Sequence, residues 1–449
     1  HAVVAVDDDP TKLNQTIHGV PVKGTLEDIP DLCKRYGIHS IIIAIPTLKG
    51  SKLNHVIDLC VSTHCAVQLL SDPQLVGSGT PQQGAFRELN PADFLSRDEV
   101  TLDADQISGY LTGKTVLVTG GGGSIGSELC RQVMRFKPGK LLIFDIYENC
   151  AYELLMELQQ KYGRDIPVTV LIGSIRDKKR LDEVFETYHP TVVFHAAAHK
   201  HVPLMEVSPA EAVKNNVLGT KNLLVSASEH DVERFVQLST DKAVNPTSVM
   251  GCTKRICEML IQTFAGNTDM KCVAVRFGNV LGSHGSVIPL FEAQIKKGGP
   301  VTLTDPNIER YFMTIPEAAQ LVLQAGALAE SGNIYVLDMG EPVKIMDLAK
   351  QLIRFYGYEP GVNMEIKIVG LRPGEKLYEE LMMDEEQDKM RRTQHNKIFV
   401  ASPRSIDLAE FYGQLQELAA AAEHNDEGVV QQLAKMIPTF TPTRQNLKL

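Results

Sequence analysis

The chain has 449 residues, of which 43% are hydrophobic and 22% charged, so it is long enough for two or more domains and apolar enough for a large core. Its formal net charge of -10 excludes nucleic acid or an anionic membrane surface as the main partner, because both attract dense positive charge. It contains no apolar run of roughly 18 residues, the length that spans a membrane, and no signal peptide. Its eight cysteines form no C-x-x-C pair, which indicates buried thiols in a reducing compartment, the cytoplasm.

Residues 1–80 alternate between predicted strands and helices, which indicates a parallel sheet in a first Rossmann-like domain. The predicted elements are Val3–Val6, Gly19–Val22, Leu26–Tyr36, Ile41–Ile45, Ser51–Thr63 and Ala66–Leu70. The first strand runs into Asp7, Asp8 and Asp9 instead of glycines, so no phosphate loop is predicted and the domain has a structural or regulatory role. A polar connection over residues 81–110 is predicted to be a linker.

A glycine-rich turn opens the second domain. The predicted strand Lys114–Thr119 is followed by Gly120, Gly123 and Gly126 at G-x-x-G-x-x-G spacing, and then by a predicted helix from Ser127. Such a turn lets a pyrophosphate approach the backbone N–H groups at a helix N-terminus. The residues expected to contact a dinucleotide here are Thr119, Gly120, Gly123, Ser124, Ile125 and Gly126.

Asp145 ends the next predicted strand, 19 residues after Gly126, where a carboxylate accepts hydrogen bonds from ribose hydroxyls. Its negative charge would repel a 2′-phosphate, and no arginine follows in Ile146–Glu148, so NAD is favoured over NADP. Asp177 follows a third strand, Val168–Ile172, and has two equally weighted interpretations. It either contacts the adenine amine or caps the following helix.

The strand that begins at Val192 ends in the small residues Ala196, Ala197 and Ala198, as expected where a flat cofactor crosses a sheet. His195, His199, Lys200 and His201 are close in sequence, but no cysteine or acidic residue joins them, so no metal site is predicted. His199 and Lys200 are candidates for substrate contact, with a purely structural role as the alternative.

The segment Ser239 to Lys254 carries the candidate chemistry. Thr240, Asp241 and Lys242 follow the apolar strand that ends at Leu238, at the edge where an open α/β sheet presents its catalytic groups. Further on, Met250 and Lys254 lie four residues apart on one face of a predicted helix. Short-chain dehydrogenases/reductases (SDRs) have Tyr-x-x-x-Lys at this place, so methionine replaces the expected tyrosine.

Together with R-F-G-N-V and L-R-P-G-E-K-L-Y-E-E-L, these motifs make residues 114–400 resemble the nucleotide-sugar 4,6-dehydratases of the extended SDR superfamily. Met250 matches the membrane-anchored bacterial polysaccharide-biosynthesis branch, which acts on UDP-N-acetylglucosamine. The resemblance implies an α/β fold of two Rossmann-like, doubly wound domains. The second domain, residues 111–449, would comprise an NAD-binding core (about 111–275), nucleotide-sugar-binding elements (about 276–400) and C-terminal helices (401–449).

Members of that branch begin with transmembrane helices, and this chain begins at His1 without them. The resemblance therefore implies a soluble portion of a protein that lies on the cytoplasmic face of the bacterial inner membrane and takes part in glycan biosynthesis. The predicted helices Pro209–Glu229 and Ser248–Phe264 suggest contacts in a homo-oligomer, a dimer or higher.

The reaction implied by the resemblance is an internal redox cycle, which classes the enzyme as a lyase. NAD⁺ takes a hydride from C4 of the sugar, a base removes the C5 proton, the C6 hydroxyl leaves with acid assistance, and the hydride returns to C6. Lys242 is expected as the base, which requires a lowered pKa, and Asp241 as the acid, although the two roles can be reversed. Thr240 orients the C4 hydroxyl and Lys254 binds the nicotinamide ribose, while the acceptor of the C4 proton stays open because the Met250 thioether cannot take it.

The resemblance also implies the residues that hold the nucleotide sugar: Asn279, Pro289, Thr302, Thr304, Arg310, Arg372 and Glu375. The methionine branch implies retention at C5, and inversion is the alternative. A UDP-sugar 4-epimerase is a further alternative, although it does not require the acid and base of the Thr-Asp-Lys run. A sensing module that binds NAD without turnover is the alternative outside enzymes, suggested by the missing tyrosine.

Overall fold

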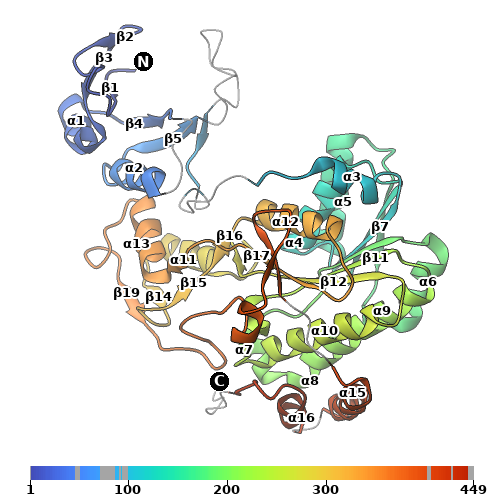
Figure 1. The fold of residues 1–449 in the computed structure, drawn as a ribbon. Coiled ribbons are helices and arrows are strands. Elements are labelled where there is room, and N and C mark those ends of the chain that lie inside the picture. The colour runs from blue at the N-terminus through green and yellow to red at the C-terminus, as the bar shows by residue number, and fades with distance from the viewer. Residues whose placement is uncertain are drawn as a thin grey trace. The chain divides into compact units, whose positions relative to one another are not determined.

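The computed structural model describes residues 2–45, 51–70, 86–90, 93, 100–401, 406–425 and 428–442. The chain divides into two compact units (Figure 1). The first unit comprises His1–Glu99, Gly285–Asn307 and Val343–Val369, and the second comprises Val100–His284, Ile308–Pro342 and Gly370–Leu449. Two segments from the predicted catalytic domain thus group with the N-terminal residues, and the predicted domain boundaries stay a prediction.

Within the described part of the second unit, nine strands form one sheet in the order β20-β21-β17-β12-β11-β10-β7-β8-β9. The seven strands from β17 to β9 are parallel, whereas at one edge β21 pairs antiparallel with β17 and β20 pairs antiparallel with β21. The strands are β7 (Thr115–Thr119), β8 (Lys140–Asp145), β9 (Val168–Ile172), β10 (Val192–His195), β11 (Arg234–Leu238), β12 (Lys271–Arg276), β17 (Ile334–Leu337), β20 (Arg391–Arg392) and β21 (Ile398–Ala401). The predicted α/β fold with a parallel sheet is confirmed.

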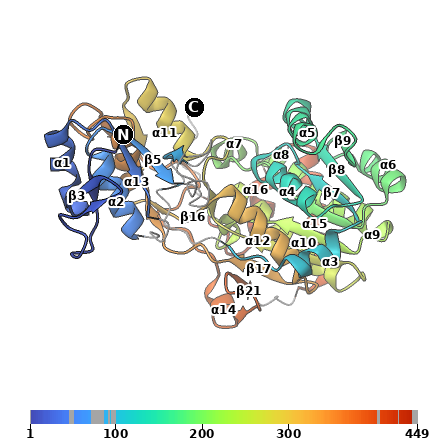
Figure 2. The ribbon, with the colours of Figure 1, turned by 90° about the horizontal axis from the view of Figure 1, so that it is seen from above.

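The strands are apolar along their length because both faces of the sheet are covered. Neighbouring residues of β7 show this directly: Leu117 packs into one buried cluster with Phe185 and Leu223, whereas Val118 packs into the other with Leu129. Figure 2 shows the helices that surround this sheet. They are α3 (Ala104–Leu111), α4 (Ser124–Arg135), α5 (Glu148–Tyr162), α6 (Lys178–Tyr188), α7 (Val202–Val207), α8 (Pro209–Ala212), α9 (Gly219–Glu229), α10 (Val249–Ala265), α12 (Ile315–Ala327), α14 (Asp384–Gln387), α15 (Leu408–Glu423) and α16 (Val429–Met436).

Several short elements complete the second unit. They are β13 (Asn279–Val280), which pairs with β16 (Phe312–Met313), together with β15 (Glu309–Arg310) and the 3-10 turn η5 (Asp241–Ala243). The predicted helix over 209–229 is interrupted between α8 and α9 by a π-helical segment, η4 (Val213–Leu218). Except for its last residue, Leu111, α3 lies within the segment predicted as a linker.

The C-terminal helices α15 and α16 cover one side of α8, η4 and α10. Phe411 and Leu433 belong to the same buried cluster as Val213 and Cys252, and the Cys252 thiol lies 3.8 Å from the Leu433 carbonyl oxygen. This side of the helices that were predicted to form an oligomer contact is therefore buried within the chain. The homo-oligomer stays a prediction, and this covered side is not free to form it.

The first unit contains three small sheets among its described residues, one of which pairs β14 (Val301–Leu303) in parallel with β19 (Ile366–Ile368). β1 (Ala5–Val6) and β2 (Thr16–Ile17) flank β3 (Val20–Gly24), and β5 (Ala66–Leu70) lies between β4 (Ser40–Ile43) and β6 (Phe86–Glu88). The pairs β1–β3 and β4–β5 are parallel as predicted, whereas β2 and β6 pair antiparallel. Its other elements are η1 (Leu26–Asp28), α1 (Ile29–Tyr36), α2 (Ser51–Val61), α11 (Val287–Lys296), β18 (Val343–Lys344) and α13 (Ile345–Phe355).

No helix among the described residues combines the length and the apolar composition that crossing a membrane requires.

Candidate functional site

The glycine-rich turn connects β7 to α4 and needs glycine for steric reasons. Gly120 has φ +67°, and a Cβ there would lie 2.7 Å from the Ala197 nitrogen. A Cβ on Gly126 would collide with the Gly120 carbonyl oxygen. The turn therefore packs against both the end of β10 and the first turn of α4, which leaves its N–H groups near the α4 N-terminus for an anion.

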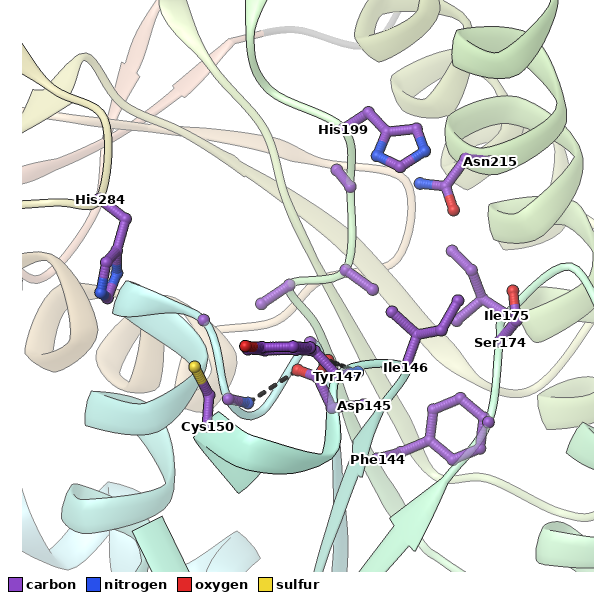
Figure 3. Close-up of a pocket in the computed structure, with 17 residues that line it drawn as sticks. Phe144, Asp145, Ile146, Tyr147, Cys150, Ser174, Ile175, His199, Asn215 and His284 are labelled. Carbon is purple, nitrogen blue, oxygen red and sulfur yellow. Dashed lines mark hydrogen bonds between the residues drawn. The ribbon is translucent and has the colours of Figure 1, made fainter. Parts of the chain in front are cut away.

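A cavity of about 420 Å³ lies where the strand order reverses, between β7 and β10. This is the crevice at which open α/β sheets bind ligands. Its lining comprises Gly120, Gly122, Gly123, Phe144, Asp145, Ile146, Tyr147, Cys150, Gly173, Ser174, Ile175, Ala196, Ala197, Ala198, His199, Asn215 and His284. In Figure 3, His284 lies on one side of the cavity and His199 and Asn215 lie on the other.

Asp145 joins the end of β8 to the glycine-rich turn. Its Oδ2 accepts a hydrogen bond from the Gly122 N–H at 2.8 Å, and its Oδ1 accepts one from the Tyr147 N–H at 2.9 Å (Figure 3). Each carboxylate oxygen has two lone pairs, so both retain capacity for a ribose hydroxyl. The glycine turn, the acid and the small residues 196–198 of the cavity wall suit a dinucleotide.

Not every residue expected at the cofactor lines this cavity. Asp177 is exposed and caps α6, because its Oδ1 accepts a hydrogen bond from the Arg180 N–H at 3.0 Å. Of the two interpretations given for Asp177, the structure shows the helix cap. Ser124 Oγ lies 3.1 Å from His284 Nδ1. Thr119 is buried, and Ile125 packs against the buried cluster that contains Val118.

His195 is a buried structural histidine, because its ring lies between two threonine hydroxyls. Nδ1 lies 2.7 Å from Thr119 Oγ1 and Nε2 lies 3.0 Å from Thr220 Oγ1. Burial, together with the nearby Lys254 ammonium, lowers the pKa of His195 to about 3, so the ring is neutral. No group of three metal-ligating side chains occurs among the described residues, so the neighbouring His199 and His201 belong to no such group.

The Thr240–Lys242 turn forms one hydrogen-bonded group at the end of β11. Thr240 Oγ1 donates to Asp241 Oδ1 at 2.8 Å, and Lys242 Nζ donates to the same oxygen at 3.0 Å. Lys242 Nζ also donates to Asn279 Oδ1 at 3.3 Å. Asp241 is fully buried, and its Oδ2 finds no hydrogen-bond partner in the described part of the chain.

The expectation that the Lys242 pKa is lowered is wrong for this arrangement. Burial alone disfavours the ammonium, but the carboxylates of Asp241 and Glu379 outweigh burial and the opposing Arg310, so the pKa of Lys242 is raised. Glu379 Oε1 lies 3.6 Å from Lys242 Nζ. Lys242 is therefore a cation in this structure.

Met250 and Lys254 lie one turn apart on α10, and both are buried. Met250 packs in a hydrophobic cluster with Val249 and Cys252. Lys254 Nζ donates to the Leu238 carbonyl oxygen at 2.6 Å, and burial lowers the Lys254 pKa. Lys254 is thus tied to the strand end that carries the Thr240–Lys242 turn.

The predicted nucleotide-sugar residues are divided between the two units. Arg310 is buried in the second unit and donates to the Lys376 carbonyl at 2.7 Å, and its Nη2 lies 3.5 Å from Glu375 Oε1. Arg372 is exposed, and Nη2 lies 3.5 Å from the same Glu375 oxygen. Lys200 is also exposed. Pro289, Thr302 and Thr304 lie in the first unit, where Thr302 Oγ1 accepts from Gln294 Nε2 at 2.7 Å.

Residues 116–403 match the family model described as polysaccharide biosynthesis protein. The chain belongs to this family. The matched residues contain the glycine-rich turn, the Thr240–Lys242 turn and the segment around Glu379. These segments also carry the motifs that predicted an extended SDR fold.

Similar proteins come from several bacteria. The capsular polysaccharide biosynthesis protein CapD of Staphylococcus aureus is 53% identical over 384 residues, which cover 85% of this chain and 64% of CapD, so the chain spans less than two thirds of that relative. A UDP-glucose 4-epimerase of Rickettsia rickettsii is 33% identical over 353 residues. The aligned residues cover 75% of this chain and 98% of the epimerase. The inverting UDP-N-acetylglucosamine 4,6-dehydratase of Campylobacter jejuni is 34% identical over 59% of this chain and 76% of its own length.

A solved structure is also similar. Pen from Bacillus thuringiensis superposes with a TM-score of 0.61 and 34% identity, over 66% of this chain and 90% of Pen.

Several residues that line the cavity or contact Lys242 were not predicted from the sequence. Asn215 and His284 reach the cavity from η4 and from the loop after β13, and Glu379 reaches Lys242 from 137 residues further along the chain. Their positions follow from tertiary folding and not from local spacing. For Glu379, its place in L-R-P-G-E-K-L-Y-E-E-L is the one signal that could have found it.

Proposed function

We propose that the chain is the catalytic portion of a UDP-N-acetylglucosamine 4,6-dehydratase that retains the C5 configuration. The observation that carries the proposal is the position of the Asp241–Lys242 pair. It follows β11, which pairs in parallel register with β10, and the residues after β10 line the dinucleotide cavity. An acid and base pair therefore lies one strand away from the candidate hydride-transfer site, at the same edge of the sheet.

The cofactor proposed for the cavity is NAD. The glycine-rich turn would receive its pyrophosphate, and Asp145 would accept hydrogen bonds from the adenosine ribose. A 2′-phosphate would meet the Asp145 carboxylate, which disfavours NADP. When bound, the nicotinamide would accept a hydride from C4 of the sugar and later return it to C6.

Asp241 and Lys242 hold the proton that elimination of water requires. In the resting chain they form an ion pair, with 3.0 Å between Nζ and Oδ1. Transfer of one proton from Lys242 to Asp241 converts this pair into a neutral amine and a carboxylic acid, which are the base for C5 and the acid for the C6 oxygen. Exclusion of water by the substrate favours this neutral form, because burying two charges is costly.

The proton balance of the elimination step closes. The Lys242 amine takes the C5 proton and becomes an ammonium, while the Asp241 carboxyl gives its proton to the C6 hydroxyl, which leaves as water and restores the ion pair. Over the whole cycle, oxidation at C4 releases one proton from the C4 hydroxyl, and C5 takes up one proton when the hydride returns to C6, so these two steps offset each other. Thr240 donates to Asp241 Oδ1, and we infer that its hydroxyl oxygen orients the C4 hydroxyl of the sugar.

The test is to incubate the purified chain with NAD and UDP-N-acetylglucosamine and to analyse the nucleotide sugar by mass spectrometry. We expect a product lighter by one water. NMR of the product formed in deuterated water reports the C4 ketone, deuterium at C5 and the C5 configuration, for which we expect retention. Inversion at C5 would leave the dehydratase proposal standing and overturn its stereochemistry.

A 4-epimerase is the second candidate, favoured by the Rickettsia relative that the chain covers almost completely. An epimerase would give an isomer of unchanged mass. Binding of NADH without turnover of any UDP-sugar would instead support a sensing module. The membrane-associated location of the full-length protein and its homo-oligomeric state stay predictions.

A further inference from the structure

We propose that Glu379 is a positioning residue that acts through Lys242, holding the lysine in place and setting its protonation in the acid and base group. The catalytic role given to Glu379 rests on the proposed function. Its physical core, that a second carboxylate controls the charge of Lys242, is testable without turnover.

Glu379 is placed against Lys242 and has little access to solvent. Its side chain is 3% exposed, and Oε1 lies 3.6 Å from Lys242 Nζ. The same oxygen lies 3.9 Å from Arg310 Nε. Its second oxygen, Oε2, is buried and accepts no hydrogen bond from any described residue. A buried carboxylate oxygen without a donor is costly, so a structural role alone gives a poor account of this glutamate.

Two carboxylates therefore face one ammonium. Asp241 approaches Lys242 Nζ at 3.0 Å and Glu379 at 3.6 Å, while Asn279 supplies a neutral oxygen at 3.3 Å. Arg310 is the positive group that opposes them, and it is in turn shared with Glu375 at 3.5 Å. The Tyr311 phenol, whose pKa is raised by burial and by nearby Glu341, Glu309 and Asp241 carboxylates, is a neutral neighbour of this group.

The backbone around Glu379 is fixed by several hydrogen bonds, so its carboxylate is held in position. Arg310 donates to the carbonyls of Lys376 and Leu377 at 2.7 and 3.1 Å, and Lys376 Nζ donates to the Val244 carbonyl at 3.1 Å. Thr247 Oγ1 donates to the Gly374 carbonyl at 3.0 Å. These contacts connect the segment after Arg372 directly to the turn that follows Lys242.

Glu379 thus opposes loss of the Lys242 proton in the resting site and stabilises the ammonium that forms when C5 is deprotonated. Asp241 remains the proton partner, because it is hydrogen-bonded to Nζ, whereas Glu379 acts by its charge. Removing the Glu379 charge should lower the pKa of Lys242 by about one unit or more, the usual effect of an opposite charge at this distance.

The variant Glu379→Gln tests this inference with two measurements. The first is the pH at which Lys242 is half-labelled by a small acylating reagent, read by peptide mass spectrometry; the Lys242 side chain is 22% exposed and accessible to it. We expect this midpoint to fall by about one pH unit or more in the variant. The second is the pH profile of kcat/KM for dehydration, whose Lys242-dependent limb should move in the same direction.

Glu380→Gln is the matched control, because Glu380 is the next residue, is exposed and pairs with Lys376 at 2.9 Å. It should leave both the labelling midpoint and the pH profile of the wild-type chain in place. A Glu379→Gln chain that is folded by circular dichroism and labels with the wild-type midpoint would overturn the inference. Equal shifts in both variants would also overturn it, since the effect would then not belong to Glu379.

Glu379→Asp provides the same comparison if the glutamine variant does not fold. The aspartate keeps the negative charge but is one methylene shorter, so the carboxylate lies further from Lys242 Nζ. The pH midpoint of Lys242 labelling should therefore fall, but by less than in a variant without the charge. An unchanged midpoint would overturn the inference. Wild-type protein that dehydrates no UDP-sugar would instead count against the proposed function, and the labelling result would stand apart from it.

Discussion

Asp145 Oδ2 accepts a hydrogen bond from the Gly122 backbone N–H at 2.8 Å, which joins the end of β8 to the glycine-rich turn 23 residues earlier. A Cβ on Gly122 would lie 3.2 Å from the same oxygen. The Asp145 carboxylate therefore has two roles. It holds the glycine-rich turn in place, and it puts negative charge where the ribose of a dinucleotide is expected.

Asp145→Asn should weaken NADH binding about tenfold, or about 1.4 kcal/mol, because it removes a charged acceptor but keeps the side-chain shape. NADPH binding should weaken less, because the variant also loses the charge that repels the 2′-phosphate. The ratio of NADH affinity to NADPH affinity should therefore become smaller. Titration calorimetry of both dinucleotides measures the two affinities. Asp165→Asn, at an exposed position outside the cavity lining, is the control and should bind both as the wild-type chain does.

Lys242→Ala should reduce dehydration of UDP-N-acetylglucosamine by about 10²–10⁴-fold, since it removes one partner of the acid and base pair. Met250→Leu is a matched variant on the nearby helix, where it keeps the volume of a buried, apolar side chain that cannot accept a proton. We expect it to keep most of the activity. Met250→Tyr should also retain activity, with some loss of stability from overpacking. A fully active Lys242→Ala chain would show that the base lies elsewhere.

Local spacing made much of the candidate dinucleotide site predictable. Gly120, Gly126 and Asp145 stand within one strand-turn-helix-strand unit, and such units fold in the same way wherever that spacing recurs. The small residues after β10 were predictable for the same reason. All of these features depend on contacts between segments that are close in sequence or adjacent in the sheet.

The charge of Lys242 was not predictable, because it depends on Glu379 and Arg310, which approach from distant segments. Sequence alone suggests that burial lowers the lysine pKa, but it does not show how many carboxylates share the buried space. The same limit applies to the covering of α10 by α15 and α16. That contact arises from the packing of apolar helix faces, and an apolar face in the sequence does not show which other helix will cover it.

A buried charge network fixes the start of the Thr240–Lys242 turn. Glu258 binds Arg276 through two hydrogen bonds at 2.8 and 3.0 Å, and Ser239, the residue before Thr240, donates to Glu258 Oε1 at 2.7 Å. Glu386 also pairs with Arg276 at 2.8 Å. The Arg276 charge lowers the Glu258 pKa to about 2 despite burial, so the carboxylate is ionised.

Glu258→Gln should lower the free energy of unfolding by about 3 kcal/mol, the typical cost when one partner of a buried ion pair is lost. It should also slow dehydration, because Ser239 loses its charged acceptor. Urea denaturation followed by circular dichroism measures the first effect. Glu186→Gln, on the exposed side of α6, should change stability by no more than about 0.5 kcal/mol. Equal stabilities for the two variants would contradict the importance given to this network.

His195 should make the stability of the chain depend on pH. Its folded pKa is about 3, below the ordinary value of 6.5, because the buried ring is held neutral between Thr119 and Thr220. Between these two values the unfolded chain binds a proton that the folded chain does not, so stability rises with pH and is lost as the pH falls from 6.5 toward 3. The slope from this one group should reach about 1.4 kcal/mol per pH unit.

His195→Gln removes this titration and keeps a side chain that can both donate to one threonine and accept from the other. We expect the wild-type chain to lose stability faster than the variant as the pH is lowered from neutrality toward pH 4, as measured by urea denaturation at a series of pH values. The difference between the two curves cancels the contribution of the carboxylates, which both chains share. Parallel curves would mean that the buried ring accepts a proton in the folded chain.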